Sequence, residues 1–163
     1  MTVKKNISTG LSDFDDTEIV SWDPKYITGI DLIDKQHKEL FIIINQLNEA
    51  CHIGGDAVDF TFKESMSKMV QYVRVHFSTE DYFLKLIKFP EYEDHKKQHD
   101  TLIKSILDAA AQYNSGKAFV PNAFVRTLKD WILSHIAFYD KAYATYVAEQ
   151  KKKGLLRDAQ IHS

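Results

Sequence analysis

Hydrophobic residues recur along four stretches of this chain, in steps that alternate between three and four positions. The stretches cover residues 30–51, 59–88, 91–114 and 121–150. Each is too long for a strand, and this spacing places the hydrophobic side chains on one face of a helix. Glycine and proline, which interrupt helices, lie between the stretches or at their ends, at Gly54, Gly55, Pro90, Gly116 and Pro121. The pattern predicts an all-α fold, an up-down-up-down four-helix bundle.

Polar residues interrupt these hydrophobic faces near their middle. Burying one charge or unpaired imidazole costs several kcal/mol in rough terms. One such residue could be a satisfied polar group in the core, but six across four helices would destabilise it unless something binds them. The sequence therefore predicts a buried metal site. The six residues are His37, His76, Glu80, His95, His99 and His135.

Asp140 extends this set through an irregular spacing. It follows His135 by five residues, and a regular helix would turn it about 140° away from the histidine. A single wide turn of the i→i+5 type would bring the two side chains back to one face, and such turns are frequent at functional sites. We therefore expect a local helix distortion between His135 and Asp140.

The ligand chemistry favours two metal ions over one. The pairs His76 with Glu80 and His95 with His99 are each four residues apart, so each pair shares one face of its helix. A ligand set rich in imidazole suits iron, copper, nickel or zinc. Seven ligands are too many for a single ion, and carboxylates can bridge two.

The joint motif resembles that of bacterial hemerythrins, members of the hemerythrin-like family. That family has a lone histidine on the first helix, His-x-x-x-Glu on the second, His-x-x-x-His on the third and His-x-x-x-x-Asp on the fourth, and all seven positions match. The segment from Trp22 to Ile30 also resembles the family's extended N-terminal arm. The similarity covers about Ser21 to Tyr146.

The resemblance implies a non-haem di-iron centre. One iron would have three histidine ligands and the other two, while both carboxylates and a solvent-derived oxo or hydroxo group would bridge them. This arrangement leaves one coordination position open on the iron with two histidines, where dioxygen would bind reversibly. The three histidines would be His95, His99 and His135, the two would be His37 and His76, and the carboxylates would be Glu80 and Asp140.

An apolar pocket beside the open position would keep water away from bound oxygen. Trp131 and Ile132, one turn before the last histidine, are candidates to line it, and Phe41, Phe77 and Phe138 are further ones.

The chain departs from the family pattern just after the bridging glutamate. Asp81 and Leu84 stand where relatives often carry glutamate and methionine. Neither position binds metal, but the change can alter the pocket shape and the retention of oxygen.

Other functions of a di-iron protein remain open at this point. A redox enzyme (an oxidase, a peroxidase-like enzyme or a nitric oxide reductase), an iron-store protein and a signalling module are the alternatives. Ferritin-like enzymes need two Glu-x-x-His motifs, and the chain has one match, Glu49 to His52. With no triad or phosphate loop in the sequence, we expect no catalytic residues and favour oxygen storage, delivery or sensing.

Size and composition set the remaining expectations. The 163 residues indicate one domain. We expect a flexible N-terminal extension over residues 1–20, a hemerythrin-like domain over 21–150 and a C-terminal tail over 151–163. The net charge of −2 gives no electrostatic case for binding nucleic acid or an anionic membrane.

The sequence also indicates a cellular location. Cys51 is the single cysteine, so no disulfide framework exists. The polar N-terminus lacks the apolar region of a signal peptide, and the most apolar run, residues 40–44, is too short to cross a bilayer. We expect a cytoplasmic monomer whose partner is dioxygen.

Overall fold

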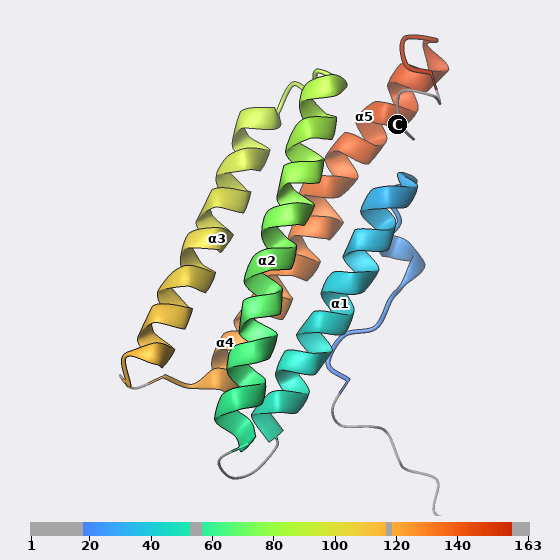
Figure 1. Cartoon of the computed structure of the whole chain (residues 1–163). Coiled ribbons are helices and arrows are strands. Elements are labelled where there is room, and N and C mark those ends of the chain that lie inside the picture. Colours follow the sequence, from blue (N-terminus) through green and yellow to red (C-terminus); the bar gives the residue numbers. More distant parts are fainter. Residues whose placement is uncertain (1–17, 53–56, 117–118, 158–163) are drawn as a thin grey trace, which may run out of the picture.

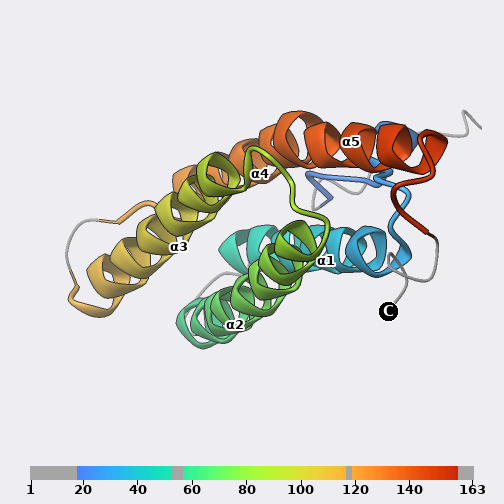
Figure 2. The ribbon, with the colours of Figure 1, turned by 90° about the horizontal axis from the view of Figure 1, so that it is seen from above.

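The computed structural model describes residues 18–52, 57–116 and 119–157, and its regular elements there are all helices. The helices are η1 (Pro24–Tyr26), α1 (Asp31–His52), α2 (Ala57–Leu86), α3 (Tyr92–Asn114), α4 (Pro121–His135), η2 (Ile136–Asp140) and α5 (Lys141–Lys152). α4, η2 and α5 follow one another directly, so the long helices form four rods, which lie side by side (Figure 1). The view from above shows α1 and α2 in one layer and α3 with α4 and α5 in the other (Figure 2). The predicted four-helix bundle is confirmed.

The fourth rod is one continuous helix with an irregular middle. α4 and α5 are ordinary α-helices, and the five residues of η2 between them are π-helical. The expected distortion between His135 and Asp140 is therefore present at the expected place. Because a π turn contains more residues than an α turn, it changes which residues after His135 face the core.

Two hydrophobic clusters fill the bundle. One contains Leu40 and Val73 and extends toward the end where α1 meets the start of α2. The other contains Ile33, Leu84 and Val147 and extends toward the turn between α2 and α3. The polar residues of the sequence motif lie between the two clusters along every rod. Apolar packing on both sides therefore holds this polar layer in the interior.

The N-terminal arm lies along the bundle before α1 begins. Trp22 and Tyr26 both pack against Phe41, with ring centroids 5.6 and 5.3 Å away. The side chain of Asn45 accepts hydrogen bonds from the backbone N–H groups of Ile19 and Val20. These contacts join the arm to α1 and fix where the first rod starts.

The start of α1 is held by one carboxylate. Asp34 accepts hydrogen bonds from the backbone N–H and the hydroxyl of Thr28, both at 2.8 Å, and from the N–H of Gly29 at 3.1 Å. The Thr28 hydroxyl in turn accepts from the N–H of Ile30. Gly29 has a φ of 80°, a backbone conformation that favours glycine.

Replacing Asp34 with alanine should therefore destabilise the protein by about 1–2 kcal/mol, because three donors lose their partner at a helix start. Urea unfolding followed by circular dichroism measures the change. The exposed neighbour Lys35 provides the control, since its replacement by alanine should leave the free energy of unfolding almost unchanged. Equal effects at both positions would contradict this role for Asp34.

Some expectations fall on parts that the structure leaves undescribed. The expected N-terminal extension lies outside the described residues as far as residue 17, and the expected tail does so from residue 158. Within the described residues, no helix combines the length and hydropathy needed to span a membrane.

Candidate metal centre

All seven residues of the sequence motif meet in the polar layer. Each is buried, with at most 3% of its surface exposed. They come from all four rods, which is why the bundle must be assembled before the site exists. The residues are His37 on α1, His76 and Glu80 on α2, His95 and His99 on α3, His135 at the end of α4 and Asp140 at the end of η2.

Three imidazoles converge on one point. The Nε2 atom of His99 lies 3.0 Å from the Nε2 of His95 and 3.0 Å from the Nε2 of His135. Neutral imidazoles carry one N–H each, so three nitrogens facing one another cannot all be paired by hydrogen bonds. Ligand atoms held about 2.1 Å from one metal ion at right angles lie about 3.0 Å apart. The spacing fits a shared cation.

Two further imidazoles form a second group. The rings of His37 and His76 meet edge to face, with centroids 4.8 Å apart. Neither ring nitrogen of His37 has a hydrogen-bond partner, and its Nε2 lies 3.1 Å from a carboxylate oxygen of Asp140. A buried imidazole with both nitrogens unpaired by hydrogen bonds fits a metal ligand better than a structural core histidine.

Each carboxylate faces both histidine groups. Glu80 has Oε2 3.1 Å from the Nε2 of His99 and Oε1 3.8 Å from that of His37. Asp140 has Oδ1 3.2 Å from the Nε2 of His135 and Oδ2 3.1 Å from that of His37. Both Asp140 oxygens lack a hydrogen-bond partner although they are buried. Such orphaned oxygens are costly unless cations neutralise them, so the donor set fits two metal ions.

The π turn explains how Asp140 reaches this position. It adds the extra residue that lets Asp140 share a face with His135, as the spacing of five required. The same turn moves Phe138 outward, where 73% of its surface is exposed. The expectation that Phe138 lines the pocket is therefore wrong, because the expected distortion, which a regular i+3 spacing from His135 leaves out, turns Phe138 away from the core.

Gln36 is a site residue that the sequence did not reveal. Its side-chain oxygen accepts a hydrogen bond from the Nδ1–H of His76 at 3.1 Å, and its amide donates to the hydroxyl of Thr79 at 3.2 Å. This contact fixes the His76 tautomer and leaves its Nε2 free for a metal. A polar residue directly before His37 looks like an ordinary surface position, so only the burial of Gln36 marks its role.

Tyr143 is the second such residue. It is fully buried, and its hydroxyl donates a hydrogen bond of 2.6 Å to Oε1 of Glu80. Burial first, and then the negative charges of Asp140 and Glu80, raise the pKa of Tyr143 well above its ordinary value. The phenol therefore stays protonated, and its hydroxyl holds the Oε1 atom of the Glu80 carboxylate in place. Its position three residues after Asp140 was the available signal.

Replacing Tyr143 with phenylalanine should weaken metal binding by about tenfold, since removing an outer partner of a ligand costs roughly 10–100-fold. Competition with a coloured chelator measures the affinity. Tyr146→Phe is the matched control. The Tyr146 hydroxyl donates to two backbone oxygens at 3.4 Å, those of Ile87 and Lys88, and not to a carboxylate of the site. Equal loss in both variants would contradict the role of the Tyr143 hydroxyl.

Burial and the interactions between the histidines and the carboxylates set the protonation states of the metal-free site. Burial would raise the pKa of Asp140, yet nearby histidines, His135 first, lower it to about 2. Burial lowers the pKa of His76 to about 4. Burial would also lower the pKa of His99, but hydrogen bonding to Asp81 and Glu80 outweighs burial and raises this pKa to about 9. For His37, burial is likewise outweighed, chiefly by Asp140, so its pKa is raised.

Metal binding at pH 7 should therefore release protons, because imidazole must be neutral to bind metal. His99 and His37 have raised pKa values and would lose theirs, giving about one to two protons per chain. Titration of the metal-free chain with Zn²⁺ in lightly buffered indicator dye counts them. The number should fall as the pH rises toward 9. Release of no protons at pH 7 would contradict these ionisation states.

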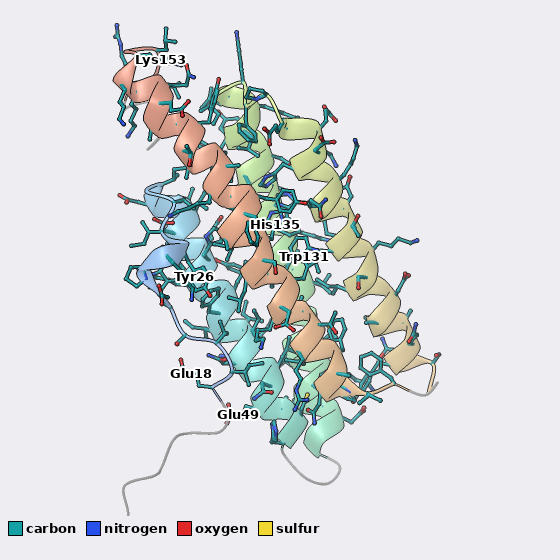
Figure 3. All side chains as sticks on the ribbon, turned by 180° about the vertical axis from the view of Figure 1, so that it is seen from behind. Glu18, Tyr26, Glu49, Trp131, His135 and Lys153 are labelled. Atoms are coloured by element: carbon teal, nitrogen blue, oxygen red, sulfur yellow. The ribbon has the colours of Figure 1, made fainter. Side chains whose placement is uncertain are left out.

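A small apolar cavity adjoins both histidine groups. It measures about 10 Å³, room for about one water-sized molecule. His76 and His135 border it, and Figure 3 shows His135 and Trp131 close together on α4, midway along the bundle. The expected pocket residues Phe77, Trp131 and Ile132 do line it. The other lining residues are Leu40, Val73, Leu102 and Ile136.

Phe41 is a second correction to the expected pocket. It is buried, but it packs against Trp22 and Tyr26 beneath the N-terminal arm instead of lining this cavity. The hydrophobic periodicity placed Phe41 in the core correctly. It could not show which part of the core the ring would fill, because that depends on where the arm lies.

Comparison with known proteins identifies the family. Residues 28–147 match the family model described as the hemerythrin HHE cation binding domain. The chain is 27% identical over 116 residues to a bacteriohemerythrin of Methylococcus capsulatus, covering 71% of this chain and 86% of that protein. It is 25% identical over 132 residues to a myohemerythrin of Theromyzon tessulatum, covering 80% and 95%.

Solved structures agree with the sequence relatives. A wild-type hemerythrin superposes with a TM-score of 0.72 at 25% identity, covering 78% of this chain and 96% of the other. A mutant form of hemerythrin gives 0.73 with the same identity and coverage. The matched region contains all seven residues of the buried layer. The chain therefore belongs to the hemerythrin HHE cation binding domain family.

Proposed function

We propose that this protein binds dioxygen reversibly at a non-haem di-iron centre, for oxygen storage, delivery or sensing. The observation that carries the proposal is the pair of carboxylates, Glu80 and Asp140, held between two groups of buried histidines. The family description as a cation binding domain supports a metal at this place. The imidazole-rich donor set is compatible with iron.

The proposed ligands divide between the two ions as the contacts suggest. Three histidines would hold one ion and two the other, and the two carboxylates would bridge. With that division the ion held by two histidines would have fewer protein ligands than the other, and one of those two histidines, His76, borders the cavity. Two ferrous ions, when bound, would offer dioxygen a coordination position and the electrons that its binding requires. The three are His95, His99 and His135, and the two are His37 and His76.

The protein's own part is to exclude water and to hold the ligands still. The cavity has apolar walls apart from His76 and His135, so its lining would offer a bound gas molecule no general acid and a water molecule few hydrogen-bond partners. Gln36 orients His76, and Tyr143 orients Glu80. A small apolar space whose lining offers no acid or base beyond the two histidines supports binding over chemical turnover.

A spectroscopic experiment tests the proposal. The iron-loaded protein is reduced without oxygen, exposed to oxygen and then evacuated. A visible absorption band that appears with oxygen and disappears under vacuum, repeatedly and with two irons per chain, is the expected result. Conversion to a stable ferric form with steady consumption of a reducing substrate would support a redox enzyme instead. Binding of many more than two irons per chain would support an iron store.

A further inference from the structure

An aromatic stack connects the candidate metal centre with the surface. The ring of His135 lies between two aromatic rings, each four residues away along the fourth rod. Trp131 stacks on one face, with centroids 4.5 Å apart and planes 11° from parallel. Tyr139 stacks on the other, at 5.3 Å and 20°. Rings at this spacing are in van der Waals contact.

Tyr139 is the most exposed member of this stack. It is 41% exposed, whereas Trp131 is half-buried and His135 is 3% exposed. Its ring also meets His95 edge to face at 6.4 Å, so it contacts imidazoles on two rods. The other ring stacked on an imidazole of the site is Phe77 on His99, and Phe77 is buried. Tyr139 therefore gives a short path from solvent to the centre.

The proposed function creates a need for such a path. A centre that loses its electrons can bind oxygen again only after both ions return to the ferrous state. The cavity of about 10 Å³ beside the site is far too small to admit a reductant. Electrons must therefore arrive through protein atoms, and tunnelling favours the route with the fewest and narrowest gaps between contacting groups.

We propose that the Tyr139 ring and the His135 imidazole form the electron entry route to the centre, a role that rests on the di-iron site proposed above. The donor is an outer-sphere one-electron reductant. Each donor molecule loses one electron and one ferric ion gains it, so two donors reduce one centre. The Tyr139 ring stays neutral, keeps its phenol proton and supplies only contact.

Phe138 provides a matched control for this route. It neighbours Tyr139 on the same π turn and is more exposed, yet it contacts no other aromatic ring in the described part of the chain. The route depends on the aromatic ring at position 139 and not on the hydroxyl of Tyr139, so Tyr139→Phe should preserve it. Leucine at 139 removes the stack and leaves an apolar residue in its place.

The experiment measures reduction of the diferric protein by hexaammineruthenium(II), an outer-sphere cation that cannot enter the cavity. Stopped-flow loss of the ferric absorption gives the rate. Tyr139→Leu should slow reduction by about tenfold or more, while Tyr139→Phe and Phe138→Leu should stay within about twofold of wild type. Iron content and midpoint potential should be the same in all four proteins, so that driving force does not explain the difference.

A second measurement examines the stack without iron. In the metal-free protein, the ring current of Tyr139 should shift the His135 imidazole signals in the NMR spectrum. Leucine at 139 should remove that shift and phenylalanine should keep it. An unchanged His135 signal in the leucine variant would contradict the stack.

The outcomes separate this inference from the proposed function. If wild type holds two irons and binds oxygen reversibly while Tyr139→Leu is reduced as fast or faster, the entry route is wrong and the function stands. A phenylalanine variant as slow as the leucine variant would also overturn a route through the ring. If wild type lacks the irons or the oxygen band, the proposed function fails first.

Discussion

Replacing Glu80 with alanine should remove both metal ions, whereas replacing His76 should affect mainly one. The Glu80 carboxylate contacts imidazoles of both groups, at 3.1 Å from His99 and 3.8 Å from His37. Its loss removes a ligand from each ion at once. The affinity should fall well beyond the roughly 10–100-fold that follows loss of an outer partner.

Metal analysis of the purified, iron-loaded variants checks this expectation. Glu80→Ala should retain almost no iron after gel filtration against a chelator, and His76→Ala should retain up to one ion per chain. His52→Ala is the histidine control, because His52 is exposed at the end of α1 and contacts backbone oxygen of Asn48. Two ions retained by Glu80→Ala would show that this carboxylate does not bridge.

The sequence contained most of the information that specifies the polar layer. Spacings of four on α2 and α3 place two ligands on one helix face, and the structure keeps them there. The spacing of five before Asp140 conflicted with a regular helix, and the π turn resolves that conflict. Both inferences needed only helical geometry, because each pair lies on one element.

Contacts between elements were harder to foresee. Tyr143 reaches Glu80 on another rod, and Gln36 reaches His76 likewise. Such partners depend on how two helices are turned and shifted relative to each other, which periodicity does not specify. For the same reason the prediction that Phe41 lines the pocket was wrong, since its ring lies under the N-terminal arm. The prediction for Phe138 was wrong for a different reason, because the π turn changes the helical register that periodicity assumes.

Removing the metal should lower the stability of the whole bundle. A metal that binds the folded chain and not the unfolded one contributes its binding free energy to folding. Without cations, two buried carboxylates remain, and the raised pKa values of His37 and His99 mean that protons replace part of the positive charge. We expect chelation to reduce the free energy of unfolding by roughly 3–5 kcal/mol or more.

The variant Asp140→Asn separates the metal's contribution from that of the protein fold. In the loaded protein it removes a charged ligand facing both groups, so it should cost several kcal/mol. In the metal-free protein the carboxylate still faces His37 and His135, which outweigh burial and lower its pKa to about 2, so the ionised form also stabilises the metal-free fold at pH 7. We therefore expect the substitution to destabilise metal-free wild type too, by about 1–3 kcal/mol, but less than it destabilises the loaded protein.

Urea unfolding of both proteins, with and without metal, completes a thermodynamic cycle in which the coupling energy is the difference between the two effects of the substitution. A large coupling energy means that Asp140 contributes more to binding the cations than to the metal-free fold. Equal destabilisation in both states would mean that the carboxylate is a structural partner of His37 and His135. The buried acids of this core would then require no metal to explain them.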